Sequence, residues 1–268
     1  MDALRLAALT TLRQALTILG PVAFLALLLH ALEKLLSARL ISRLGWRGVL
    51  VTGWLGVPVH ELSHVVACWI FGHRVERVQL FAPDRTTGRL GSVQHAWQRR
   101  NPYQQVGRFF IGIAPLLGGA AALWGLTAWL APVDLAFPRL APGADLFQVM
   151  GVIGDQVGAL FGALTQPGAL ASGRTWLWLY LCLCVGAHLA PSGSDLKGGL
   201  PGFVLLVVLV FLTNLVVTWT RGDPAAGEQF ALSVSAPAMA LFSLALALGA
   251  GGLAVVTLVT APLPERGG

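Results

Sequence analysis

Residues 46–71 read WRGVLVTGWLGVPVHELSHVVACWIF, an apolar run with His60, Glu61 and His64 in its middle. The run exceeds the roughly 20 residues that a helix needs to cross a membrane. Two imidazoles and a carboxylate inside such a helix are costly unless they have partners. The stretch therefore predicts a membrane-spanning helix that carries a functional site.

The spacing of these polar residues is that of a metal site. On a helix, His60 and His64 lie one turn apart on the same face, so both imidazoles can reach one ion. Glu61 points to the adjacent sector, where it can accept a proton from an attacking water. His-Glu-x-x-His is typical of zinc hydrolases. The alternative is a chance match between two core histidines, but it leaves three polar residues at ligand spacing in an apolar helix unexplained.

The composition is that of a membrane protein. The chain has 268 residues, of which 56% are hydrophobic and 11% charged, and its mean hydropathy is +0.73. The net charge is +6, which in a soluble protein would suggest a nucleic-acid partner. Here the arginines flank apolar runs, so we expect them to set the orientation in the membrane and expect no nucleic-acid partner.

Six apolar runs are long enough to be considered as spans. We expect an all-α polytopic protein that forms a single membrane-embedded domain over residues 1–268. The last run is longer than a crossing requires, so we expect it to tilt or to break near residues 249–252. The predicted spans are residues 16–36, 46–71, 106–130, 175–190, 203–219 and 230–258.

Two connections between spans have structure of their own. Residues 75–81 and 89–97 flank Ala-Pro-Asp-Arg-Thr-Thr-Gly at 82–88, which predicts a β-hairpin after the second span. Apolar residues recur at helical spacing over 146–164, which predicts an amphipathic helix on the membrane surface after the third span. For this second segment, another packed helix is the alternative.

The basic residues predict an orientation. The connection after the second span is strongly basic, whereas the one after the third is nearly neutral. The positive-inside rule then places the N-terminus in the cytoplasm, in what we expect to be a bacterial cytoplasmic (inner) membrane. The first connection conflicts with this assignment because it carries Arg39, Arg43 and Arg47.

A catalytic zinc usually takes three protein ligands, so one ligand must come from elsewhere in the chain. Asp195 is the best candidate, because Pro191 and Gly193 break the helix before it and let a loop fold back towards His64. The alternative for Asp195 is a turn-forming aspartate at a helix terminus. The other candidates are Asp145, Asp155 and His188.

Over residues 49–198 the chain resembles the site-2 proteases, a family of intramembrane zinc metalloproteases. The resemblance implies that His60, His64 and Asp195 hold Zn²⁺ and that Glu61 is the catalytic acid/base. Residues 110–119, Phe-Ile-Gly-Ile-Ala-Pro-Leu-Leu-Gly-Gly, resemble the family's Gly-Pro segment in the intervening helix.

The second family motif is degenerate here. The aspartate comes one residue early relative to Pro191, and Ala114 replaces the glycine before the proline. His188 stands where the family has an asparagine. It could contact the substrate or the oxyanion in place of that asparagine, or could itself be the third metal ligand.

The resemblance implies hydrolysis of a peptide bond in or near a transmembrane segment of a membrane-protein or peptide substrate. The hairpin over 75–97 could pair with the unwound substrate by strand addition, or it could be a basic loop that contacts lipid headgroups. Two rival functions are a non-catalytic binding or regulatory protein on the same scaffold and a metal transporter. Glu61 favours hydrolysis over transport, because an ion path needs no base between the histidines.

Overall fold

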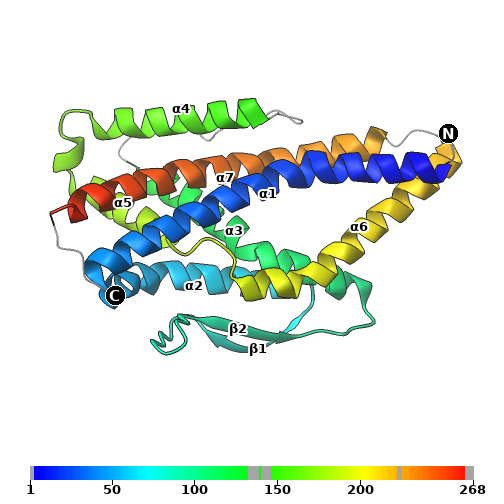
Figure 1. Cartoon of the computed structure of the whole chain (residues 1–268), viewed down its shortest axis with the longest axis horizontal. Helices are drawn as coiled ribbons and strands as arrows, with labels where there is room; N and C mark the ends of the chain where they lie inside the picture. Colours follow the sequence, from blue (N-terminus) through cyan, green and yellow to red (C-terminus); the bar gives the residue numbers. More distant parts are fainter. Residues whose placement is uncertain (1–2, 132–138, 140–145, 222–224, 263–268) are drawn as a thin grey trace.

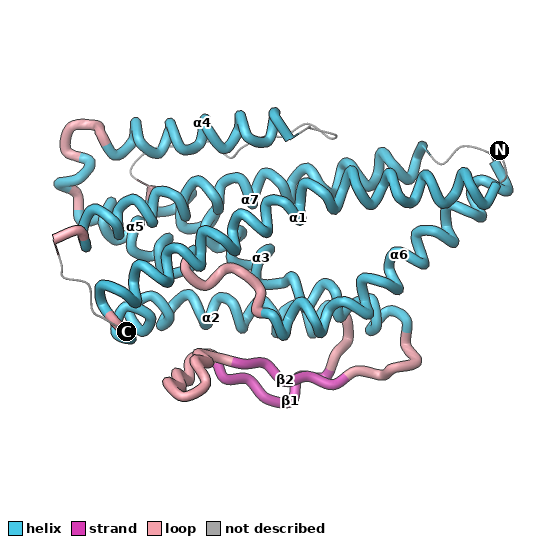
Figure 2. Tube along the Cα trace, viewed as in Figure 1, coloured by secondary structure: helices cyan, strands magenta, loops and turns pink. Residues whose placement is uncertain are grey.

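The computed structural model describes residues 3–131, 139, 146–221 and 225–262. This part of the chain forms a bundle of long helices with one small antiparallel sheet against its side (Figure 1, Figure 2). In chain order the elements are α1 (Ala3–Leu44), α2 (Trp46–Ile70), β1 (Arg74–Gln79), β2 (Ser92–Ala96), α3 (Pro102–Leu130), α4 (Leu146–Leu164), the 3-10 turn η1 (Ala169–Ala171), α5 (Gly173–Gly186), α6 (Gly193–Arg221) and α7 (Ala225–Thr260).

The expected fold class is confirmed. Among the described residues, six helices are long and apolar enough to cross a membrane, namely α1, α2, α3, α4, α6 and α7. The predicted span at 175–190 is a shorter helix, α5, that ends at Gly186. Helix α5 has only 14 residues and is about 21 Å long at 1.5 Å per residue, which is shorter than a hydrocarbon core of about 30 Å.

Helix α4 has the bounds that were expected for the amphipathic segment, Leu146–Leu164. It lies alongside α7 and is aligned with it (Figure 1). It is also apolar enough to cross a membrane. The helix is thus found with the expected bounds and packs on α7, and its position on the membrane surface stays a prediction.

The main core lies between α1, α3, α5 and α7. Leu25, Leu123, Trp178 and Phe242 come from these four helices, and each is less than 2% exposed. Helix α7 passes through residues 249–252 without a break. Its glycines there permit close packing: a Cβ added at Gly249 would lie 2.7 Å from Cδ2 of Leu32 on α1.

The predicted hairpin is confirmed. Strands β1 and β2 pair antiparallel with Val78 opposite Val93, and a bulge lies between Val75 and Arg77. In the turn, Asp84 accepts hydrogen bonds from the backbone N–H and the hydroxyl of Thr86. These bonds lower the pKa of Asp84 to about 2. The hairpin lies along α2 (Figure 2), so it is placed beside the helix that carries the histidine motif.

Candidate metal centre

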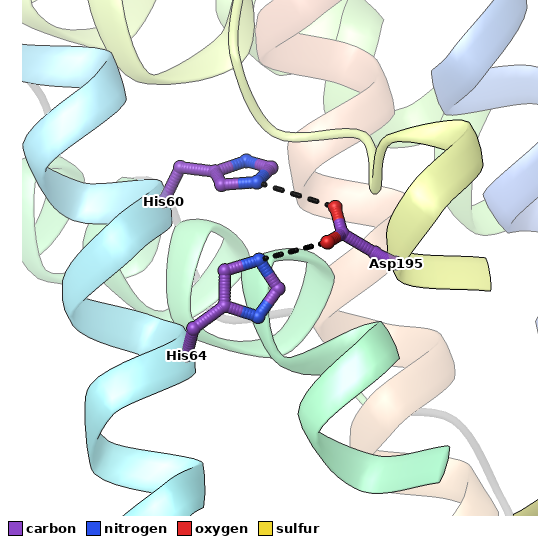
Figure 3. Close-up of side chains that lie close together, drawn as sticks. All are labelled: His60, His64 and Asp195. Atoms are coloured by element: carbon purple, nitrogen blue, oxygen red, sulfur yellow. Dashed lines mark ion pairs between the residues drawn. The ribbon is translucent and has the colours of Figure 1, made fainter. Parts of the chain in front are cut away.

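Three side chains from two helices converge inside the bundle. His60 and His64 project from α2, and Asp195 projects from the first turn of α6 (Figure 3). Nε2 of His60 lies 3.7 Å from Oδ2 of Asp195, and Nε2 of His64 lies 3.5 Å from Oδ1. All three ligand atoms lie within 4.8 Å of one another.

The hydrogen bonds of the two imidazoles fix their tautomers. Nδ1 of His60 pairs with the carbonyl oxygen of His188 at 2.9 Å, and Nδ1 of His64 pairs with that of Ile111 at 2.8 Å. A carbonyl can only accept, so each Nδ1 donates a proton, and each neutral ring keeps a free lone pair on Nε2. Metal-binding histidines in proteins are held in this way.

The sequence explains why these two carbonyls are available. Pro115 has no N–H, so the helical hydrogen bond that would reach back four residues to Ile111 is missing from α3. The freed carbonyl of Ile111 accepts the proton of His64 instead. His188 lies beyond the C-terminal end of α5, where carbonyls have no intrahelical partner.

Asp195 is oriented by the start of its own helix. Ser192 precedes α6, and its backbone N–H and hydroxyl both donate to Oδ2 of Asp195, at 2.7 and 2.6 Å. The backbone N–H of Asp195 donates in return to Oγ of Ser192 at 3.2 Å. This reciprocal pattern is a capping box. Asp195 therefore fills the helix-terminal role that was considered as its alternative, and it also faces the two histidines.

The spacing of the three side chains leaves room for a metal ion between them. Two ligands bound about 2.1 Å from zinc at a tetrahedral angle are separated by about 3.4 Å. The separations between the carboxylate and the two Nε2 atoms are 3.7 and 3.5 Å. These separations exceed those of well-formed charge-assisted hydrogen bonds.

Glu61 lies beside this group and is 7% exposed. It lines a cavity of ≈ 690 Å³ together with His60, His64 and Asp195. Residues 88–95 of the hairpin form another wall of the same cavity. Gly91 comes so close that an added Cβ would lie 2.8 Å from Oε1 of Glu61. The hairpin backbone thus passes directly over the carboxylate.

The other candidate ligands take different places. Within the described ranges, the group that could hold a metal ion consists of His60, His64 and Asp195, and His188 is not part of it. His188 lines the cavity, and its Nε2 hydrogen-bonds Oγ1 of Thr52 at 3.1 Å. Asp155 lies on α4, and Asp145 lies outside the described residues.

A second histidine pair anchors the hairpin to α3. His73 Nε2 donates to the carbonyl of Gln104 at 2.8 Å, and His73 Nδ1 lies 2.9 Å from Nδ1 of His95. Burial lowers the pKa of His73. Burial and the charge that His73 would carry lower the pKa of His95 to about 4. Both lowered pKa values favour neutral rings at physiological pH, as suits a structural role.

Sequence reasoning missed three residues that support the site. Ser192 could have been found, because Ser-x-x-Asp before an apolar run is a helix-start signal. Thr52 gives no local signal, because its contact with His188 comes from packing of α2 on α5. Glu33 lies inside the first predicted span without a local signal for a partner, and it accepts a hydrogen bond from the loop before α6.

Comparisons with known proteins found no matching family model, no matching curated protein and no matching solved structure.

Proposed function

We propose that this protein is an intramembrane zinc metalloprotease that resembles the site-2 proteases. The observation that carries the proposal is the arrangement of His60, His64 and Asp195. Two imidazoles are held by carbonyls with Nε2 free, and a carboxylate faces both at separations that suit zinc. The site lies on helices that are apolar enough to span a membrane.

The residues divide the chemistry between them. Zinc held by His60, His64 and Asp195 would lower the pKa of a water molecule and polarise the peptide carbonyl. Glu61 accepts the proton of the attacking water and then passes it to the leaving amine. Its burial beside the histidines in a shared cavity suits this role.

The hairpin supports a peptide substrate over a small molecule. A transmembrane helix hides its peptide bonds in its own hydrogen bonds, so a substrate must unwind and then needs new backbone partners. Strand β2 contributes Ser92–His95 to the cavity wall and pairs with β1 along one edge. Its other edge can pair with an extended substrate segment beside Glu61.

Transport is the less favoured function. Two polar residues of the last two spans, Asn214 and Ser243, already have partners inside the bundle. Asn214 donates to Thr11 and Gln14 of α1, and Ser243 donates to the carbonyl of Met239. The bonds of Asn214 join α6 to α1, as interhelical hydrogen bonds do in lipid.

The proposed location is a bacterial cytoplasmic membrane with the N-terminus in the cytoplasm. The basic residues of the hairpin and its flanks support this orientation. Accessibility of a cysteine placed at Arg99 or Arg100, exposed residues between β2 and α3, measured from each side of sealed vesicles, would decide it.

The decisive functional test compares the wild-type protein with Glu61→Gln on a panel of transmembrane peptides in detergent or vesicles. We expect the wild type to cleave at least one peptide and Glu61→Gln to cleave none. Glu76→Gln is the matched control, because it makes the same change on the exposed hairpin, at a side chain that is 45% exposed. Equal cleavage by wild type and Glu61→Gln would reject the mechanism. Absence of cleavage by a metal-loaded wild type across the panel would favour the non-catalytic alternative.

A further inference from the structure

The connection between α5 and α6, residues 187–192, ties the parts of the metal site together. The carbonyl of His188 orients His60, and Ser192 begins the capping box that orients Asp195. The segment between them is buried: Leu189 is 3% exposed and Ala190 is 7% exposed. A shift of this connection would therefore move two of the three ligands at once.

The connection is not helical at Ala190, so the backbone N–H of Ala190 has no helical partner. A buried amide of this kind costs free energy unless something accepts its proton. Glu33 supplies the acceptor: its Oε2 receives the N–H of Ala190 at 2.6 Å. The distance is short, as expected for a hydrogen bond to a carboxylate.

Glu33 comes from α1, a long and largely apolar helix. Its neighbours along the chain are Leu32, Lys34 and Leu35, and Leu35 is 59% exposed. An acidic residue inside a membrane-spanning helix is costly without a specific partner, and here that partner is the connection that carries the site. Glu33 also lines the cavity that contains Glu61 and the ligand group.

We propose that Glu33 is a positioning residue of the metal site, acting through the connection between α5 and α6. It holds the Ala190 amide so that the His188 carbonyl meets Nδ1 of His60 and Asp195 faces both histidines. Glu33 does not touch the ligand atoms in this scheme. The inference rests on the proposed metal site. The claim that Glu33 holds the connection between α5 and α6 does not depend on metal and is tested in the metal-free protein.

Two substitutions separate the roles of the acceptor oxygen and the bulk of the side chain. Glu33→Gln keeps an oxygen that can accept the Ala190 proton. Glu33→Leu keeps a similar volume and removes the acceptor. Leu35→Ala is the matched control on the same helix, because it alters an exposed side chain two positions away. If Glu33→Leu does not fold, Glu33→Asp carries the same prediction, because its shorter side chain withdraws the acceptor from Ala190.

The first measurement is hydrogen exchange of the Ala190 amide in the metal-free protein. We expect exchange about tenfold or more faster in Glu33→Leu than in wild type, as follows from loss of a hydrogen bond to a charged group. Glu33→Gln should exchange at a rate near that of wild type, and Leu35→Ala at the wild-type rate. Equal exchange in wild type and Glu33→Leu would overturn the inference. A Glu33→Gln variant that exchanges as fast as Glu33→Leu would overturn it as well.

The second measurement is the affinity for Co²⁺ or Zn²⁺, with the Co²⁺ absorption spectrum as a report on ligand geometry. We expect about tenfold weaker binding and an altered spectrum for Glu33→Leu, with both restored in Glu33→Gln. Unchanged binding and spectrum in Glu33→Leu, in a protein whose wild type binds metal, would refute the positioning role. A wild type that binds no metal would instead refute the proposed function, and the exchange result would still decide whether Glu33 holds the connection.

Discussion

Gly112→Ala should damage the proposed metal site without touching any of its ligand side chains. Gly112 lies on α3, where a Cβ added to it would lie 2.6 Å from the carbonyl oxygen of Asp195. Ordinary van der Waals contact begins at 3.4 Å. The backbone of Asp195 must therefore move away from α3 by about 0.8 Å, which is the difference between these two distances. Metal sites tolerate ligand displacements of only about 0.2 Å.

The expected consequence is a loss of function larger than the loss of stability. A misplacement of about 1 Å in an enzyme site costs on the order of 100-fold in rate. Overpacking of this kind costs about 1–3 kcal/mol of folding free energy. We therefore expect Gly112→Ala to fold, to bind zinc more than about tenfold more weakly, and to cleave peptide about 100-fold more slowly.

The assay is a zinc titration against a competing chelator, followed by peptide cleavage at saturating zinc. Gly125→Ala is the matched control, because it makes the same change on the same helix with nothing within 4 Å of the added Cβ. Zinc affinity and cleavage rate equal to those of Gly125→Ala would refute the proposed contact between α3 and the start of α6.

Three further changes test other parts of the site. Gly91→Ala would bring a methyl group to 2.8 Å from Oε1 of Glu61, so we expect slower cleavage with an unchanged zinc content; unchanged cleavage would show that the hairpin backbone is not closely packed there. Ser192→Ala removes the cap that orients Asp195, so we expect about 1 kcal/mol lower stability and weaker zinc binding in the same titration; retained affinity would show that the cap does not position the ligand. The pKa of His95 is lowered to about 4, so the folded state favours the neutral ring; its contribution to stability is complete above the unfolded pKa of about 6.5 and falls as the pH drops towards 4. The unfolding temperature, measured as a function of pH, should fall between about pH 6.5 and 4 in the wild type and should fall less in His95→Gln. Equal decreases in the two proteins would show that His95 does not contribute to this pH dependence.

The sequence predicted the parts of the fold that are decided locally. The spans followed from runs of apolar residues, the hairpin followed from its turn composition, and the face shared by His60 and His64 followed from helical spacing. The segment 175–190 was mispredicted because a buried irregular connection is as apolar as a helix. Hydropathy alone does not show that the helix ends at Gly186, four residues before Ala190.

The residues that complete the site were harder to predict because their partners are distant in the chain. His64 meets Ile111 and Glu33 meets Ala190 only after the helices pack. Pro115 was nevertheless a usable signal, because a proline inside a helix leaves the carbonyl four residues earlier without its usual donor. The candidate Asp195 was identified from the helix break before it, and the structure brings it to both motif histidines.

The central claim is that one metal ion is bound by side chains inside the membrane-spanning bundle, and elemental analysis tests it most directly. Protein purified without chelators should contain about one zinc per chain, and His60→Ala, His64→Ala and Asp195→Ala should each lose most of it. Purified wild type without a divalent metal, or a His60→Ala/His64→Ala double variant that retains one zinc per chain, would contradict the account.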